Sequence, residues 1–299
     1  MTTATGNFAE LLWPGIKEIF GHTYKDYPRL YTKIFEEKKS TMRFEKVQSV
    51  TGLPLAAVKE EGNAVTFVDP SQGYQKEFVN VTYALGATVT REMFEDDQYD
   101  YINRLPKMLA RSMVQTEETL HFNVLNNGFS GGGELTADGV SVFNTSHPLV
   151  AGGNFRNQLN TNSDLSETSL EQACIDIMDW VDDQSLKIRV MPKTLVVPTA
   201  LNFIAKKILN TGTTPFSADL TTNEVSGMIK DLVVSPWLTD SDAWFLTTDQ
   251  DNGLISFLRR KESVDRDNEF ATQNLQFLVT KRWSQGAADP RGVFGTPGA

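Results

Sequence analysis

The chain has 299 residues, 40% of them hydrophobic, and a formal net charge of -10. This length and composition allow a globular fold of one or two lobes and argue against wholesale disorder. No window approaches the roughly 18 consecutive apolar residues of a membrane span. The acidic balance also argues against a surface built to neutralise nucleic-acid phosphates.

Aromatic side chains are frequent in the first forty residues, among prolines and charges. They are Trp13, Phe20, Tyr24, Tyr27, Tyr31 and Phe35. Pro14 and Pro28 are expected to interrupt any long helix. This aromatic surface must be covered, either by the body of the same chain or, in an extended arm, by a neighbouring copy. The sequence leaves both possibilities open.

Alternating apolar and polar residues predict strands in the region that follows. These are Phe44–Val50, Ala56–Val58, Val65–Val68, Phe78–Tyr83 and Ala87–Val89, separated by glycine and proline breaks. The segment reads as a long twisted hairpin with little local helix to pack against, so we expect it to project and to be buried by another subunit. The alternative is an ordinary edge ribbon of a two-layer fold.

The strongest helical pattern runs from Thr90 to Gly128. Its predicted buried face has a spacing of three and four, at Leu105, Leu109, Ser112, Met113, Thr116, Leu120, Val124 and Asn127. Pro106 must lie in the first turn of a second helix or kink the first. Glycine, asparagine and Pro148 then predict a loop-rich region from Ser130 to Ser163.

An α/β lobe is predicted next. It comprises a helix at Leu170–Val181, a buried strand at Thr194–Val197, a helix from Pro198 to Leu209, and strands at Asp231–Val234 and Ala243–Thr247. Two closing strands are predicted at Leu254–Arg259 and Leu275–Lys281, bridged by the charged stretch Arg260–Glu269. The remainder, Gly286–Ala299, is expected to be a flexible tail.

Residues that could support catalysis or bind a metal form no recognised motif. The three histidines, His22, His121 and His147, lie in different contexts, and the densest acidic set is Asp240, Asp242, Asp249 and Asp251. That set lacks calcium-loop spacing, so solvated turns are the favoured interpretation. The single cysteine, Cys174, is interpreted as a small apolar residue of a helix. We therefore predict no catalytic, cofactor-binding or metal-binding residue, and a protein that is not an enzyme.

The order of elements resembles the Hong Kong 97-type fold of major capsid proteins of tailed bacteriophages, and several sequence strings resemble the Mu-like prophage major head subunit group. The strings are Arg91–Tyr99, Leu125–Phe129, Phe143–Leu149, Asp231–Leu238 and Arg282–Gly286. The resemblance covers essentially the whole chain. It carries no chemical motif.

The resemblance implies an α+β fold with five parts. These are an N-terminal arm (1–43), an extended E-loop hairpin (44–83), a peripheral domain with a long spine helix (84–130), an axial α/β domain (131–252), and the closing strands and tail of the peripheral domain (253–299). It also implies hexamers and pentamers that close into an icosahedral shell around double-stranded DNA, with non-specific DNA contact and no membrane. No long charged coiled-coil prefix is seen, which implies a separate scaffolding protein or removal of such a segment.

Further partners implied are a portal and decoration proteins, with assembly in the host cytoplasm and a final place in the virion capsid. Some relatives cross-link subunits through an E-loop lysine and an asparagine. Lys59 and Lys76 lie in the loop here, but nothing marks a partner. Two alternatives stay open: an encapsulin-like compartment shell, and an acidic α/β hydrolase using two carboxylates.

Overall fold

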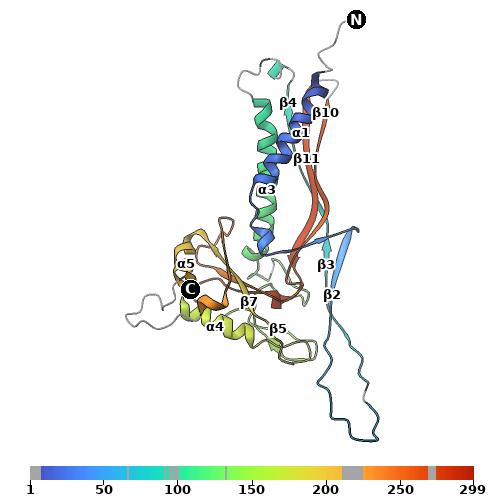
Figure 1. Ribbon diagram of the computed structural model, residues 1–299, viewed down its shortest axis with the longest axis vertical. Coiled ribbons are helices and arrows are strands. Elements are labelled where there is room, and N and C mark those ends of the chain that lie inside the picture. The colour runs from blue at the N-terminus through green and yellow to red at the C-terminus, as the bar shows by residue number, and fades with distance from the viewer. Residues whose placement is uncertain are drawn as a thin grey trace.

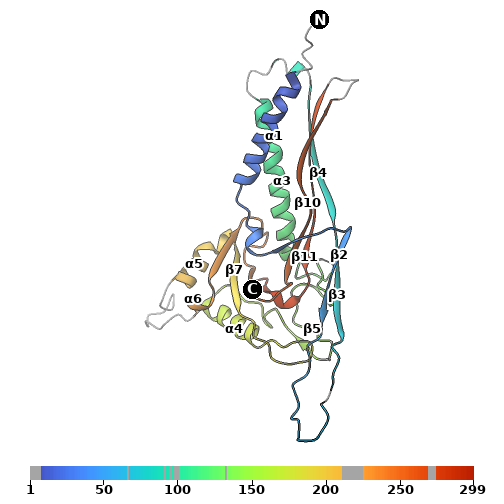
Figure 2. The same ribbon diagram turned by 45° about the vertical axis from the view of Figure 1, so that its right-hand side comes forward.

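The computed structural model describes residues 8–65, 67–90, 92–93, 96, 101–131, 133–210, 225–268 and 274–299. Side chains are described from residue 17 onward, except at 101–103, 226 and 268. Figures 1 and 2 show an elongated molecule with a column of helices and long strands, a lobe of mixed helices and strands beside its lower part, and a hairpin that projects beyond both. The helices in the described part of the chain are too short or too polar to cross a membrane.

The column is built on a four-stranded sheet in the order β1-β10-β11-β4. Its strands are β1 (Glu36–Lys39), β10 (Leu254–Asn268), β11 (Leu275–Ala287) and β4 (Val81–Val89). Helices α1 (Phe8–Asp26) and α3 (Tyr101–Asn126) pack together beside this sheet. Leu109 and Met113 of α3 share a buried cluster with Phe277, Val279 and Trp283 of β11, which joins the helices to the strands.

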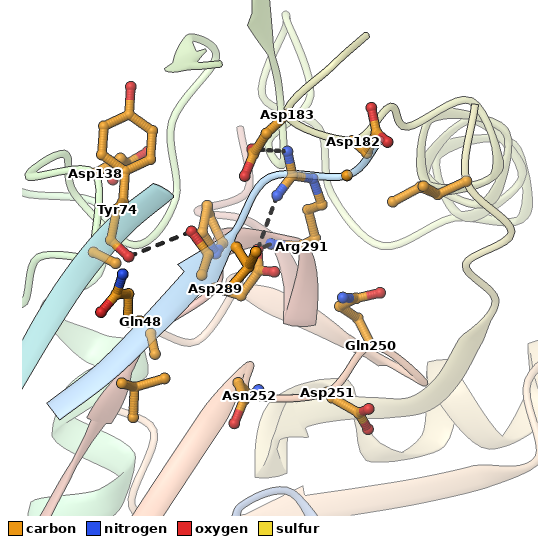
Figure 3. A pocket seen from close by; sticks show the side chains of 18 of the residues that line it. Gln48, Tyr74, Asp138, Asp182, Asp183, Gln250, Asp251, Asn252, Asp289 and Arg291 are labelled. Atoms are coloured by element: carbon orange, nitrogen blue, oxygen red, sulfur yellow. Dashed lines mark hydrogen bonds and ion pairs between the residues drawn. The ribbon is translucent and has the colours of Figure 1, made fainter. Parts of the chain in front are cut away.

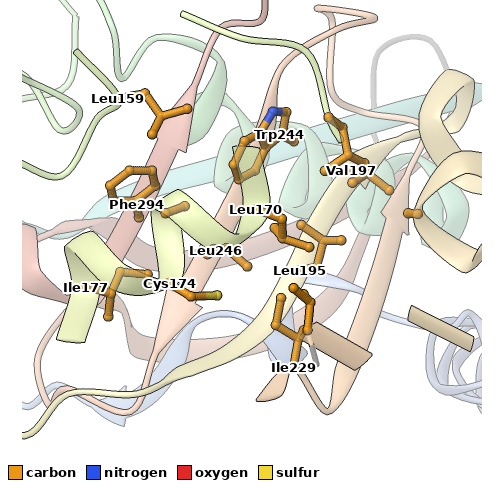
Figure 4. Packing of buried hydrophobic residues seen from close by; sticks show 14 of the residues in the cluster. Leu159, Leu170, Cys174, Ile177, Leu195, Val197, Ile229, Trp244, Leu246 and Phe294 are labelled. Atoms are coloured by element: carbon orange, nitrogen blue, oxygen red, sulfur yellow. The ribbon is translucent and has the colours of Figure 1, made fainter. Parts of the chain in front are cut away.

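The lobe contains a second sheet in the order β12-β9-β7-β8, with β7 and β8 parallel and the other pairs antiparallel. Its strands are β7 (Pro192–Pro198), β8 (Asp231–Ser235), β9 (Trp244–Thr248) and β12 (Val293–Thr296). The helices are α4 (Glu167–Met178), α5 (Asn202–Asn210) and α6 (Val225–Met228), with short 3-10 turns η3 (Thr199–Leu201) and η4 (Pro290–Gly292). Apolar side chains from both sheet and helices fill the core between them (Figure 4).

The predicted helix at Leu170–Val181 and strand at Thr194–Val197 are therefore confirmed as α4 and β7. Ser166 caps α4, accepting a hydrogen bond from the Ser169 backbone while the Ser169 side chain accepts one in return. Cys174 lies in the core shown in Figure 4, where burial raises its pKa to about 11. A thiol that stays protonated among apolar neighbours acts as a small hydrophobic side chain, as predicted.

The projecting hairpin consists of β2 (Phe44–Val50) and β3 (Gln72–Val79), paired antiparallel from Phe44↔Val79 to Val50↔Gln72. The strands predicted at Ala56–Val58 and Val65–Val68 are wrong: the described residues of that stretch form no strand. The bounds predicted for the next two strands, Phe78–Tyr83 and Ala87–Val89, are also wrong. The structure has β3 and then β4 (Val81–Val89) as two continuous strands, separated by the single residue Asn80. In the described part of the loop-rich region, β5 (His147–Pro148) and β6 (Asn154–Phe155) form a short pair, and Leu135 and Ser141 form an isolated bridge.

Two prolines behave differently from the prediction. Pro14 does not interrupt the first helix, since α1 continues from Phe8 to Asp26 through it. Pro106 lies within α3, in its second turn, where the helix continues to Asn126. Each proline lies beyond the first turn of its helix, so it removes one intrahelical N–H donor, and the helix continues on its remaining hydrogen bonds. The start predicted at Thr90 falls mostly on residues outside those described.

Two predictions about the last fifty residues are wrong. The charged stretch Arg260–Glu269 does not bridge two strands, because β10 continues through it as far as Asn268 and pairs with β11 up to Asn268↔Leu275. The tail from Gly286 onward is not flexible: it forms η4 and β12, and Val293 and Phe294 are fully buried. Strand β12 pairs with β9 and so closes the sheet of the lobe.

Candidate functional site

The far end of the hairpin carries exposed apolar side chains. We call the described residues between β2 and β3, 52–65 and 67–70, the ribbon. Val58 is 94% exposed and Phe67 92% exposed. The other exposed apolar residues of the ribbon are Leu53, Leu55, Val65 and Val68. Figures 1 and 2 show the ribbon standing clear of the rest of the chain, so nothing within the described molecule covers these side chains.

The ribbon is closed at its base by a polar clamp. Thr51, which is buried, donates from its backbone N–H to the Ser71 carbonyl over 3.0 Å, and its Oγ1 accepts from the Ser71 N–H over 2.9 Å. At the tip the Asn63 N–H donates to the Glu60 carbonyl, and Gly62 adopts a left-handed φ of 84° that suits glycine. The clamp fixes where the ribbon starts. The apolar residues in the middle of the ribbon lie outside the paired strands of the hairpin.

The root of the hairpin is fixed to the column by Asn80. Its amide donates to Ser40 Oγ (2.7 Å) and to the Met42 carbonyl (3.0 Å), and its Oδ1 accepts from Ser284 Oγ (3.1 Å). Asn80 is 5% exposed, so these hydrogen bonds replace those that water would otherwise provide. The direction in which the hairpin leaves the body is therefore set by β11 and the segment after β1 together.

A second attachment joins the side of the hairpin to the loop-rich region. Lys76 Nζ of β3 lies 2.7 Å from Glu134 Oε1, and the lysine also donates to the Leu135 carbonyl. The pair stands over Gly286, where a Cβ would come within 2.7 Å of Glu134 Oε1. Lys76 is therefore engaged inside its own chain, whereas Lys59 is exposed on the ribbon.

The N-terminal arm is attached to the column by a buried cluster of charges. Glu117 of α3 accepts a hydrogen bond from the Tyr24 hydroxyl, and its Oε1 lies 2.9 Å from Lys281 Nζ. Its Oε2 lies 3.4 Å from Arg29 Nε, and the Arg29 guanidinium covers the Tyr24 ring at 4.3 Å. Glu117 and Lys281 are both buried, so each satisfies a charge that would otherwise be costly to bury.

Beside that cluster two ionisable groups have displaced pKa values. Desolvation raises the pKa of Glu118 to about 7, although its carboxylate accepts from the backbone N–H groups of Leu30 (2.6 Å) and Tyr31 (3.3 Å). Desolvation lowers the pKa of His121 to about 4. The His121 ring stacks on Tyr31 at 4.0 Å, and its nitrogens lie 2.6 Å from the Glu117 carbonyl and 2.8 Å from Ser256 Oγ. These side chains hold the end of the arm on α3.

A cavity of about 440 Å³ separates the hairpin base from the lobe (Figure 3). Its wall is rich in carboxylates, which makes it the one place where the acidic hydrolase interpretation could be sought. Asp183, however, lies 2.8 Å from the Arg291 guanidinium, and Asp289 Oδ1 accepts from the Arg291 N–H. Asp138 is 2.7 Å from His147 Nδ1; burial alone would raise its pKa, but hydrogen bonds from His147 and Thr136 hold it below its ordinary value. These hydrogen bonds and ion pairs give Asp138, Asp183 and Asp289 structural roles in the wall of the cavity.

The other residues weighed for chemistry are scattered. His22 is on α1 beside Glu18, His121 is in the arm cluster, and His147 is bonded to Asp138 and Asn157. Asp240 accepts a hydrogen bond from the Asp242 N–H within a turn, as the turn interpretation expects, whereas Asp249 accepts one from the N–H of the distant Met191. In the described part of the chain no three acidic, histidine or cysteine side chains are arranged to hold a metal ion.

The sequence interpretation missed the arm cluster. Its predicted helix face included Ser112, Thr116 and Asn127, whereas the buried face carries Glu117 and Glu118. The signal was present, since Met113, Glu117, His121 and Leu125 recur every four residues on one side of α3. Two glutamates within an apolar face indicate buried partners, and the cations that pair with them come from the arm and from β11.

The chain is similar to known proteins in both sequence and fold. The family described as phage capsid protein matches residues 74–295. No curated protein sequence matches the chain. Among solved structures, the capsid of cyanophage P-SCSP1u is similar with a TM-score of 0.61 at 10% identity, covering 91% of this chain and 88% of that chain.

Two further structures extend that likeness. The procapsid of bacteriophage JBD30 has a TM-score of 0.53 at 16% identity, covering 98% of this chain and 76% of that chain. The holo-SrpI encapsulin complex from Synechococcus elongatus has a TM-score of 0.54 at 11% identity, covering 91% and 88%. At such identities the likeness concerns the fold alone.

Proposed function

The chain belongs to the phage capsid protein family and has a Hong Kong 97-type fold, and from this premise we propose that its ribbon is the element that joins neighbouring copies. As a major capsid protein it is a structural component of the virion shell and not an enzyme. The acidic hydrolase alternative therefore has no support from the family. The Mu-like subgroup stays a prediction.

The exposed apolar ribbon is the single observation that carries the proposal. Complete burial of a large apolar side chain contributes roughly 1.5–3 kcal/mol, and the ribbon presents six such side chains to water. A second copy that covers them supplies this free energy in proportion to the area buried. Obligate interfaces of about 2,000–5,000 Å² are built from such apolar surfaces, and several weak contacts per subunit add up through avidity.

On the same basis we propose a division of the chain into domains. Residues 1–43 act as the arm, 44–83 as the E-loop, 84–130 and 253–299 as the peripheral domain, and 131–252 as the axial domain. Subunits gather as hexamers and pentamers in the host cytoplasm, guided by a scaffolding protein, with a portal and decoration proteins added to the shell. Support for scaffold and decoration comes from the JBD30 neighbours, which are described as a procapsid and as a capsid decorated with minor capsid protein trimers.

Shortening the ribbon tests the proposal. Residues 53–69 are replaced by a two-residue Asn-Gly turn, so that the Thr51–Ser71 clamp is kept. We expect a soluble subunit with an unchanged free energy of unfolding and no shells, as measured by denaturant titration, sedimentation and electron microscopy. Shells in normal yield from this variant would overturn the proposal.

A matched pair of substitutions separates ribbon contacts from general surface hydrophobicity. Val58→Ser with Phe67→Ser removes two exposed apolar side chains from the ribbon, and Ile175→Ser with Met178→Ser removes two from the exposed face of α4. We expect the first pair to lower shell yield at least tenfold and the second pair to assemble normally. Equal loss in both would argue against a special role of the ribbon.

An encapsulin-like compartment shell is the second candidate, favoured by the fold likeness to the Synechococcus elongatus encapsulin. Both candidates require the same assembly, so the content of the shell distinguishes them. Shells recovered from the native host should contain nuclease-protected double-stranded DNA if the chain is a phage capsid protein. A protein cargo in DNA-free shells would support the compartment instead.

A further inference from the structure

A basic cavity lies between the arm and the lobe. It has a volume of about 660 Å³, and its lining includes Lys33 at the end of η2 (Tyr31–Lys33), Lys206 of α5 and Lys230 just before β8. All three lysines are exposed. They come from segments far apart in the sequence, so the fold itself brings three positive charges to one cavity.

Within the described residues, no countercharge lines the cavity beside these lysines. The lining residues include no carboxylate, and within the described residues none of the three forms an ion pair. Three like charges gathered at one cavity repel one another, so an anion that enters the cavity from outside relieves this repulsion.

The chemistry of the cavity favours phosphate groups. Apolar side chains such as Leu209, Ile229 and Leu232 line it, and such a wall supports the aliphatic stems of lysines while their ammonium groups stay in water. Lysine binds phosphate as a point charge and does not require the paired geometry that arginine provides. The cavity therefore suits contact with a phosphate backbone irrespective of base sequence.

We propose that this lysine cavity is where each subunit touches the phosphate backbone of the packaged double-stranded DNA. The inference rests on the proposed function, which supplies the DNA. Helices α5 and α6 lie on the side of the molecule that carries α1, away from β4, β10 and β11 (Figure 2), and this helical side then faces the lumen. A net charge of -10 repels phosphate over the rest of the wall, so one weak contact per subunit positions the DNA without adsorbing it.

Binding of a labelled 20-base-pair duplex to the unassembled full-length subunit tests the proposal. Fluorescence anisotropy is measured between about 20 and 150 mM salt, a range in which counterion release dominates the salt dependence of binding. The triple variant K33Q, K206Q, K230Q is compared with K17Q, K39Q, K107Q, which changes the net charge equally at exposed lysines outside the cavity. We expect the cavity variant to bind about tenfold more weakly and to lose about two to three from the slope of log K against log salt. The control variant should bind like the wild type.

Three outcomes would overturn the proposal. Equal weakening in both triple variants would mean that only overall charge matters. A poly-glutamate peptide that binds the wild-type cavity more tightly than the duplex at matched salt would assign the cavity to an acidic protein. Failure of the cavity variant to form shells, while the wild type forms them, would assign it to subunit contact. If the wild type itself forms no shells, the proposed function fails, whereas the DNA measurement on the subunit still stands.

Discussion

The N-terminal arm and the ribbon start from the same expectation and end differently. Both are apolar segments for which the sequence offered no obvious partner in their own chain. In the structure Phe20, Tyr24 and Tyr31 of the arm are at most 3% exposed, whereas Val58 and Phe67 of the ribbon are more than 90% exposed. Of the two possibilities that the sequence leaves open for the arm, packing on its own chain is the one that the structure shows for the described part, whereas the apolar side chains of the ribbon are exposed.

The difference lies in what accompanies the apolar side chains. Phe20 and Tyr24 are four residues apart and lie on one face of α1, and Tyr24 and Arg29 add polar groups that match Glu117 on α3. The ribbon has apolar residues without helical spacing, and proline and glycine weaken any local ladder. An apolar segment with a periodic face and matching polar partners folds onto its own chain. One without them remains available to another copy.

The largest expected effect comes from truncating one aromatic residue in each region. Phe20→Ala should lower the free energy of unfolding of the subunit by about 3–5 kcal/mol, because it opens a cavity in the cluster shared by α1, α3 and β11. Phe67→Ala should change it by less than about 0.5 kcal/mol, as for other exposed positions. Urea titration of the unassembled subunits gives both values.

For shell assembly, the two substitutions should have effects in the opposite order. Phe67→Ala should reduce shell yield although the subunit is as stable as the wild type. Phe20→Ala, studied at a temperature where it remains folded, should still form shells. A Phe67→Ala variant that unfolds as easily as Phe20→Ala would show that the ribbon is packed in the free subunit and would remove the contrast.

Much of the fold followed from the sequence because its elements are locally periodic. The α4 helix, with Ser166 before it, and the β7 strand carry their own signals. The closing residues did not, because they were predicted as a flexible terminal segment. The glycines of this segment mark close packing instead: a Cβ on Gly292 would clash with Gly253 Cα, and Gly295 fits between the rings of Phe143 and Phe245. Such contacts join residues far apart in sequence, and no local pattern records them.

The candidate site likewise has one part that the sequence predicts and other parts that it does not. The exposed hairpin was predicted from its alternating pattern, and β2 and β3 confirm that a hairpin projects there. The charges that hold the arm were not predicted, because Glu117 pairs with Lys281 across more than 160 intervening positions. The lysine cavity was missed for the opposite reason: the net charge of -10 averages over the chain and conceals a local excess of positive charge.

Acidity should affect the arm through two groups with opposite signs. The pKa of Glu118 is raised to about 7, so its contribution to stability is present below its ordinary value of 4.5 and is lost as pH rises toward 7. The pKa of His121 is lowered to about 4, so its contribution is present above 6.5 and is lost as pH falls toward 4. Between these limits the two contributions offset each other in the wild type.

Glu118→Gln removes one of the two and should expose the other. On acidification from pH 6.5 to 4.5 this variant should lose about 2–3 kcal/mol more unfolding free energy than the wild type, which is the size expected for one proton over that interval. Urea titrations at several pH values measure the difference. Glu60→Gln, at the exposed tip of the ribbon, is the control and should follow the wild type. Parallel pH profiles for all three proteins would show that Glu118 does not titrate in this interval.

A small effect on folding, and a specific effect on assembly, is expected at the Lys76–Glu134 pair. The pair is partly exposed, with 15% and 33% of the two side chains accessible, so breaking it should cost no more than about 1 kcal/mol of subunit stability. It nevertheless connects the hairpin to the loop-rich region at a point away from the Asn80 root. Since the ribbon extends well beyond that point, a small change of angle at Lys76 moves its apolar residues by a larger distance.

Exchanging the two charges distinguishes a role of this ion pair in orienting the ribbon from a role in subunit stability. Lys76→Glu alone and Glu134→Lys alone should each yield fewer shells with a broader distribution of diameters by electron microscopy, while their unfolding curves stay close to wild type. The double exchange restores an ion pair in the same place and should restore uniform shells. If the double variant remains as heterogeneous as the single ones, Lys76 acts through a contact with a neighbouring copy; if all are uniform, the Asn80 root alone orients the ribbon.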